Sequence, residues 1–316
     1  MRKYSLWLVF GLIVLVMGAC GSAEDKGTQN DNSNEKSETV TIEHELGTTE
    51  VPKKPEKVVV FDFGILDTLD KLGIEVAGLP QATIPSYLDK YASDDYENVG
   101  SLKEPDFEKI AEIDPDLIII SARQASLYEQ FQEITEATID LSVDTTQYMD
   151  SFKENMVTIG EIFDKESEIE EELSQIEDSI STLHEKAETS EKDALIILAN
   201  DDKISAYGPS SRFGLIHDVF GVKATDENIE ASTHGKNVSF EYVKEQNPNL
   251  LYVIDRGAAI GGESSAKTIV ENQLVENTNA YKNDDIVYLN ADYWYLSGGG
   301  LISVQEMINE VDASLE

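Results

Sequence analysis

Short runs of β-branched and other apolar residues alternate along the chain with stretches of helical spacing. The expected strands are continuous apolar runs of the kind buried in parallel sheets, at Val58-Val59-Val60-Phe61, 116–120, 194–198, 250–254 and 286–289. Residues 65–72 have helical spacing and stop at Gly73. This alternation predicts an α/β protein with Rossmann-like parallel or mixed sheets.

The longest helical signal lies in the middle of the chain. Its apolar positions recur in steps of four and three, at Ile169, Leu173, Ile176, Ile180, Leu183 and Ala187. A helix over 166–187 would extend roughly 33 Å at 1.5 Å per residue. Such a helix, with strands before and after it, is expected to join two lobes. The alternative is the seam of a coiled-coil dimer.

An internal repeat supports the two-lobe interpretation. Residues 107–123 match residues 240–256 without a gap, with Phe, Glu, Glu, Pro, Leu and Arg identical. Each copy reads as a helix, a turn at Asp-Pro or Asn-Pro, a buried strand and a final arginine. The same structural unit is therefore expected once on each side of the long helix.

The first residues are typical of a secretory signal, with a basic end, an apolar run and small residues before the only cysteine, Cys20. They resemble a bacterial lipobox, so we expect Cys20 to be a lipid anchor; the alternative is an ordinary signal with an incidental cysteine. The following segment is polar and predicts a flexible tether. We expect a signal peptide at 1–19, anchor and tether at 20–39, an N-terminal lobe at 40–165, a bridging helix at 166–190 and a C-terminal lobe at 191–316.

Composition excludes several classes of function. A formal net charge of −38 argues against nucleic-acid binding, which needs a basic surface. One cysteine excludes a disulfide scaffold and a thiolate metal cluster. Four histidines are few for a metal site with several histidine ligands. The common serine-hydrolase, zinc-protease and phosphate-loop motifs are absent from the sequence.

Arginine is scarce and its positions are informative. Beyond Arg2, the chain has only Arg123, Arg212 and Arg256, and lysine supplies the other cations. Arg123 and Arg256 follow the repeat strands, at the sheet edge where α/β proteins bind ligands. A guanidinium makes paired hydrogen bonds to anionic oxygens, so three in one cleft would suit a polyanionic ligand. The alternative is three unrelated surface ion pairs.

Further candidates lie in loops and at helix starts. Trp294, with Tyr293 beside it, precedes three glycines and is a candidate ligand wall or else a cap on the core. His234 lies on a predicted loop and either contacts ligand or is simply solvated. Glu108 and Glu241 occupy equivalent helix starts, where a carboxylate either stabilises the helix or docks on a basic receptor.

Several stretches together resemble a known family. They are Val58–Gly64, Gly100–Phe107, Ser121–Gln124, Gly208–Gly221, Ile254–Gly257 and Trp294–Gly300. With the lipobox and the repeat, they resemble the substrate-binding lipoproteins of bacterial iron–siderophore ABC importers. The resemblance covers Val40 to the end and implies two α/β lobes joined by one long helix, the class III arrangement of periplasmic binding proteins.

The resemblance also implies a function. Arg123, Arg212 and Arg256 would hold an anionic ferric siderophore of the catecholate or petrobactin type, with no enzyme activity, no intrinsic cofactor and no protein ligand on the iron. Glu108 and Glu241 would dock on permease subunits. The protein would be a monomer, lipid-anchored at the extracytoplasmic face of a Gram-positive cell membrane. The alternatives are a haem or corrinoid receptor, an anchored hydrolase, and an adhesin or scaffold.

Overall fold

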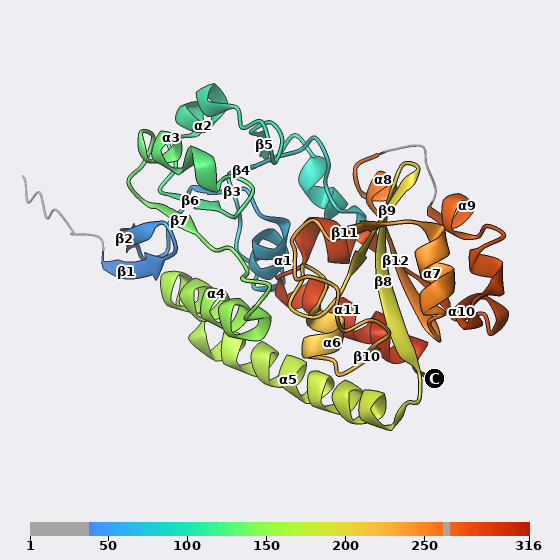
Figure 1. Cartoon of the computed structure of the whole chain (residues 1–316). Helices are drawn as coiled ribbons and strands as arrows, with labels where there is room; N and C mark the ends of the chain where they lie inside the picture. The colour runs from blue at the N-terminus through green and yellow to red at the C-terminus, as the bar shows by residue number, and fades with distance from the viewer. Residues whose placement is uncertain (1–37, 262–265) are drawn as a thin grey trace, which may run out of the picture. The chain divides into compact units, whose positions relative to one another are not determined.

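The computed structural model describes residues 38–261 and 266–316, which belong to one compact unit (Figure 1). The predicted signal peptide, Cys20 and nearly all of the predicted tether lie outside the described residues. Within the described ranges, no helix is both long enough and apolar enough to cross a membrane.

The first lobe is built on a five-stranded parallel sheet with the strand order β5-β4-β3-β6-β7. Its strands are β3 (Val58–Val60), β4 (Gly78–Leu79), β5 (Glu97–Asn98), β6 (Leu117–Ile120) and β7 (Thr138–Asp140). Its helices are α1 (Phe63–Lys71), η1 (Ser86–Ala92), α2 (Phe107–Ile113), η2 (Ala125–Leu127) and α3 (Tyr128–Gln132). An antiparallel hairpin of β1 (Thr39–His44) and β2 (Gly47–Pro52) precedes this sheet.

The second lobe has a six-stranded mixed sheet, in which β12 pairs in parallel with β8 and β13 while β9 pairs antiparallel with β8 and β11. Its strands are β8 (Asp193–Asn200), β9 (Lys203–Tyr207), β10 (Lys223–Ala224), β11 (Lys236–Val238), β12 (Leu250–Asp255) and β13 (Ile286–Leu289). Its shorter helices are α6 (Leu215–Asp218), α7 (Phe240–Gln246), α8 (Arg256–Ala259), α9 (Ala266–Val270), η3 (Val275–Asn277) and α10 (Asn279–Lys282). The segment η4 (Asp292–Ser297) is π-helical, and α11 (Leu301–Ser314) ends the chain.

Helices α4 (Tyr148–Phe163) and α5 (Glu166–Thr189) connect the two sheets, and α5 runs from the first lobe to the second (Figure 1). The apolar stripe of α5 is confirmed: Ile169, Ile176 and Leu183 are buried in a core shared by both lobes. Because this stripe is covered inside the chain, against α4 and α11, the coiled-coil alternative is wrong.

The repeat is confirmed as a structural unit. Helices α2 and α7 both end at a left-handed residue, Asp114 with φ 54° and Asn247 with φ 49°. A proline follows each of them, and β6 and β12 then enter the two sheets. Asp and Asn tolerate this conformation better than most residues, so the two sequences form the same helix-to-strand corner.

Helix α11 does not pack on one lobe alone. It follows the second sheet in sequence, yet it packs against α1 of the first lobe as well as against α5 (Figure 1). The predicted boundaries 40–165, 166–190 and 191–316 do not anticipate this return of the chain.

Candidate functional site

A cavity of about 420 Å³ is lined by both lobes. The first lobe contributes the loops that follow β6 and β7, and the second contributes the loop after β9 and the segment from Trp294 to Gly299. The polar and charged side chains on its wall include Asp62, Lys103, Ser121, Arg123, Ser142, Thr145, Arg212, Thr233, His234, Tyr295 and Ser297.

The three arginines converge on one residue, Tyr295. Arg123 and Arg212 each donate from Nη2 to the Tyr295 carbonyl oxygen, both at 2.9 Å. Arg256 is not among the residues that line the cavity; it donates from Nε to the Tyr295 hydroxyl at 2.9 Å and from Nη1 to Asn200 at 2.6 Å, so it contacts the site through Tyr295. The guanidinium of Arg212 also lies 4.4 Å from the centre of the Tyr295 ring, a cation–π contact.

The Tyr295 carbonyl can accept two guanidiniums because it lies in the last turn of η4. The last carbonyls of a helix have no partner within the helix and carry the negative end of its dipole. A single carbonyl engages only one of the five N–H donors on each guanidinium. Most donors of Arg123 and Arg212 therefore stay available to a ligand in the cavity.

No acid neutralises this cluster within the described parts of the chain, where every ion pair involves lysine or histidine. The alternative of three unrelated surface ion pairs is therefore wrong. Burial and the charge of Arg123 lower the pKa of Arg212. Burial alone would raise the pKa of Tyr295, but the hydrogen bond from Arg256 and the charges of Arg212 and Arg256 outweigh it and lower that pKa.

Local hydrogen bonds fix the loops that carry the arginines. Beside Arg123, the buried Gln124 accepts from the Ser121 amide at 3.1 Å and donates to the Leu102 carbonyl at 2.6 Å. In the Arg212 loop, Asp218 accepts from the Ser210 amide at 2.6 Å. These bonds hold the loops in place before any ligand arrives, so the cluster is preorganised.

The aromatic residues are placed differently from the expectation. Trp294 lines the cavity but is only 3% exposed, and its indole donates to Glu310 at 2.7 Å, so it is largely a core residue. Tyr293 is not among the lining residues; its ring lies 4.8 Å from the ring of Tyr87. The prediction that Tyr293 lines the site is therefore wrong, because its side chain points toward the first lobe.

Sequence reasoning missed Tyr295 and Lys103, both of which line the cavity. In the sequence, Tyr295 is marked only by its position among three consecutive aromatic residues, and this pattern does not show which of the three faces the cavity. His234 is exposed and lines the cavity together with its neighbour Thr233.

Glu108 and Glu241 lie in the exposed first turns of the repeated helices α2 and α7. A hydrogen bond from the Ser239 side chain lowers the pKa of Glu241. Both carboxylates are thus presented to solvent on equivalent elements of the two lobes.

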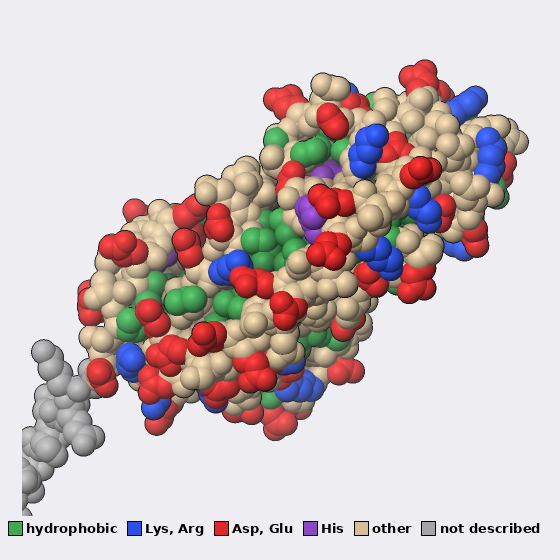
Figure 2. Space-filling view, turned by 90° about the horizontal axis from the view of Figure 1, so that it is seen from below, with side chains coloured by type: hydrophobic (Ala, Val, Ile, Leu, Met, Phe, Trp, Pro, Cys, Tyr) green, Lys and Arg blue, Asp and Glu red, His purple; other side chains and the backbone are tan. Residues whose placement is uncertain are grey.

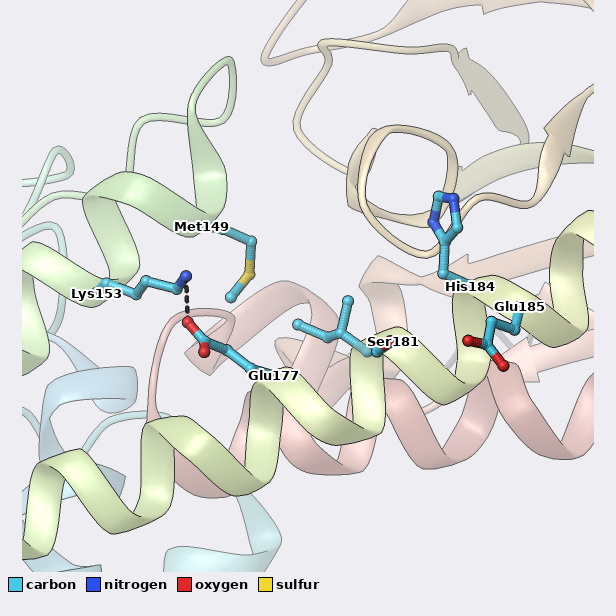
Figure 3. Close-up of a pocket in the computed structure, with 7 residues that line it drawn as sticks. Met149, Lys153, Glu177, Ser181, His184 and Glu185 are labelled. Atoms are coloured by element: carbon cyan, nitrogen blue, oxygen red, sulfur yellow. Dashed lines mark ion pairs between the residues drawn. The ribbon is translucent and has the colours of Figure 1, made fainter.

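A second hollow lies along α4 and α5 and is separate from the arginine cluster. Figure 3 shows its wall, including Met149 and His184, with an ion pair between Lys153 and Glu177. On the face seen in Figure 2, acidic side chains are spread widely with fewer basic side chains between them, in keeping with the negative net charge. The arginine cavity is therefore a positive site within an acidic protein.

Comparisons with known proteins agree on one family. A model of the periplasmic binding protein family matches residues 58–293. The chain is 54% identical over 320 residues, covering all of both chains, to the petrobactin-binding protein YclQ of Bacillus subtilis. The crystal structure of that protein matches with a TM-score of 0.87 and 57% identity, covering 88% of this chain and 99% of the other. The catecholate-siderophore binding protein VctP of Vibrio cholerae matches with a TM-score of 0.82 and 36% identity, covering 87% of this chain and 100% of the other.

Proposed function

Because the chain belongs to the periplasmic binding protein family, we propose that it captures an anionic ferric siderophore of the catecholate or petrobactin type for an ABC importer. The observation that carries this proposal is the convergence of Arg123, Arg212 and Arg256 on Tyr295 without an acidic partner among the described residues. The relatives named above are described as siderophore-binding proteins, which supports the same ligand class.

The chemistry of the cavity suits a ligand whose charge is carried by oxygen atoms. Guanidinium groups make charge-assisted hydrogen bonds to catecholate and carboxylate oxygens, and such bonds are about twice as strong as neutral ones. Iron is cargo in this proposal: it arrives already chelated, and the protein contacts the siderophore. Lys103 and His234 would add donors at the wall, and Tyr295 would supply an aromatic surface.

The two exposed glutamates suit delivery to the permease. Glu108 and Glu241 stand on equivalent helices of the two lobes, so one bound protein would present one carboxylate from each lobe. Basic pockets on the two permease subunits would pair with them. In this arrangement the protein acts as a monomer.

The N-terminal residues suit anchoring outside the cell. The apolar run before Cys20 is typical of an export signal, and a lipid on Cys20 would hold the protein at the outer face of the membrane. The polar residues after Cys20 would let the folded part reach the permease.

The haem or corrinoid alternative is not favoured, because it calls for an apolar cleft and this cavity carries guanidinium groups. The hydrolase and scaffold alternatives find no support in relatives that are named as binding proteins.

Fluorescence titration tests the proposal, because Trp294 lines the cavity and is the only tryptophan after residue 7. Ferric petrobactin at micromolar concentration is expected to quench the emission of Trp294, whereas haem and a ferric hydroxamate of no net negative charge are expected to leave it nearly unchanged. Equal quenching by haem, or no response to ferric petrobactin, would refute the proposed ligand class.

A further inference from the structure

The segment that carries Tyr295 is held from the first lobe by a group of side chains that do not themselves line the cavity. Three side chains of the first lobe, Asp67 on α1 with Ser86 and Tyr87 on η1, contact residues 292–303 of the second lobe. We call this group the clasp; its partners beyond residue 290 are Asp292, Tyr293, Ser297, Ile302 and Ser303.

Asp67 is the buried centre of the clasp. Its side chain is fully buried, and it accepts from the backbone amides of Ile302 at 3.2 Å and Ser303 at 3.0 Å. These are free amides in the first turn of α11, where the helix dipole favours a negative charge. A buried carboxylate is costly unless it is hydrogen-bonded, so Asp67 and the start of α11 hold each other in place.

Tyr87 connects Asp67 to the ligand-binding segment. Its hydroxyl lies 3.0 Å from Asp67 Oδ2 and 2.8 Å from the hydroxyl of Ser297, which lines the cavity. Its ring contacts Tyr293. On the other side, Asp292 accepts from the Ser86 amide at 2.8 Å and from the Ser86 hydroxyl. Both ends of η4 are thus tied to η1, with Tyr295 between them.

Two glycines allow this close approach. A Cβ on Gly64 of α1 would overlap the Ser297 carbonyl, and a Cβ on Gly300 would overlap Asp67 and the Gly64 carbonyl. Helix α1 and the end of η4 therefore meet backbone to backbone, which leaves little freedom for the segment between them.

We propose that Asp67 and Tyr87 are positioning residues for ligand capture, which hold the segment 292–300 so that Tyr295 stays between the three arginines. The proposal rests on the proposed function, since it assigns these residues to the affinity of that site. Neither side chain lines the cavity, so both would act through Tyr295 and Ser297, which do.

The same two helices supply a matched control. Tyr91 on η1 donates to Asp70 on α1 at 3.0 Å, so α1 and η1 share a second phenol–carboxylate bond. Among the described residues, neither Tyr91 nor Asp70 makes a hydrogen bond to the segment 292–303. The variants Tyr87→Phe and Tyr91→Phe therefore each remove one hydroxyl from the same pair of helices, and only the first loosens the clasp.

The test compares these two variants in two measurements at pH 8, because burial raises the pKa of Asp67 to about 7 and the carboxylate should be ionised. The first measurement is the affinity for ferric petrobactin. Tyr87→Phe is expected to weaken it about three- to tenfold, the effect of one hydrogen bond, while Tyr91→Phe leaves it unchanged. If Tyr87→Phe fails to fold, Asp292→Asn is measured in its place. This variant weakens the contact with Ser86 at the other end of η4 and is likewise expected to lower the affinity.

The second measurement needs no ligand. Tyr295 owes its lowered pKa to the nearby arginines, so an alkaline absorbance titration should show that pKa moving up in Tyr87→Phe but not in Tyr91→Phe. Tyr87 itself has a raised pKa, chiefly through burial, so its loss does not disturb the signal. If both variants behave alike, or if Tyr87→Phe changes only thermal stability, the proposal is wrong. If the wild type does not bind ferric petrobactin, the proposed ligand is wrong, and the titration still decides the role of the clasp.

Discussion

At the scale of single residues, the site depends on how one tyrosine organises three scarce arginines. Tyr295 offers its carbonyl to Arg123 and Arg212, its hydroxyl to Arg256 and its ring to Arg212. These contacts hold three like charges close together, which is unfavourable until an anion joins them. The cavity beside this cluster therefore has a positive potential, which a polyanionic ligand would neutralise.

The geometry of the guanidinium, and not only its charge, should matter at Arg212. We expect Arg212→Gln to weaken ferric petrobactin binding about ten- to a hundredfold, as for loss of charged hydrogen bonds. Arg212→Lys should lose about tenfold, because lysine keeps the charge but lacks the planar fork. Titration calorimetry measures both. Lys282→Gln, which removes an exposed lysine, is the control for a lost surface charge and should leave the affinity unchanged. Equal affinities of Arg212→Lys and the wild type would contradict the prediction.

Tyr295 should ionise before the buried tyrosines. Its pKa is lowered, whereas burial raises the pKa of Tyr207 and Tyr252 to about 12. The difference in absorbance at high pH between wild type and Tyr295→Phe should reveal a phenol that titrates at lower pH than an ordinary tyrosine. Because the folded pKa lies below the unfolded one, this ionisation should add stability as pH rises through the folded value. Bound ferric petrobactin should raise the pKa of Tyr295 again, because the negative charge of the ligand offsets the charges of the arginines. If the ligand leaves the difference spectrum unchanged, it does not bind next to the arginines.

The sequence predicts the arginines and not Tyr295, for a physical reason. Scarcity and repeat position single out Arg123 and Arg256, since a strand fixes where its following residue emerges. Tyr293, Trp294 and Tyr295 are equivalent in pattern, and their directions depend on the π-helical winding of η4. π-Helical turns are rare and have no simple sequence period, so the residue that faces the arginines could not be chosen in advance.

At the scale of elements, continuous apolar runs and one long stripe were sufficient to locate the central strands and α5. Both faces of those strands are buried, so their sequences are apolar throughout. The hairpin of β1 and β2 was missed because only Ile42, Thr49 and Val51 are buried in it and most of its other residues are polar. The return of α11 to the first lobe was also missed, since helix pattern does not specify which surface a helix covers.

The stripe of α5 should be a major source of stability. Ile176 is 1% exposed in the core shared by the lobes, so Ile176→Ala should lower the free energy of unfolding by about 2–5 kcal/mol. Urea unfolding measures this. Glu170→Ala, on the exposed side of the same helix, should change it by less than about 0.5 kcal/mol. Similar losses in the two variants would mean that the stripe is not buried in solution.

At the scale of the whole molecule, a strongly acidic body surrounds a cavity of opposite charge. The net charge of −38 repels an anionic ligand at long range, while the three arginines attract it close to the cavity. The two effects differ in range, and the Debye length is about 10 Å at 0.1 M salt. Salt should therefore screen the distant repulsion more than the contacts inside the cavity.

Ligand capture should accordingly be faster in salt. Stopped-flow quenching of Trp294 by ferric petrobactin should give an association rate constant that rises between about 0.01 and 0.2 M sodium chloride, where the Debye length falls from about 30 Å to below 10 Å. A rate constant that falls over this range would show that the arginine cavity, and not the acidic body, governs the encounter.

The central claim is that three guanidiniums from two lobes hold an anionic iron chelate. It is tested most directly by the equilibrium affinity for ferric petrobactin of the wild type and of the triple variant Arg123→Gln, Arg212→Gln, Arg256→Gln, with folding checked by circular dichroism. We expect the folded triple variant to bind at least about a thousandfold more weakly, because each charged group contributes about tenfold or more. A folded triple variant that binds as tightly as the wild type would contradict the account.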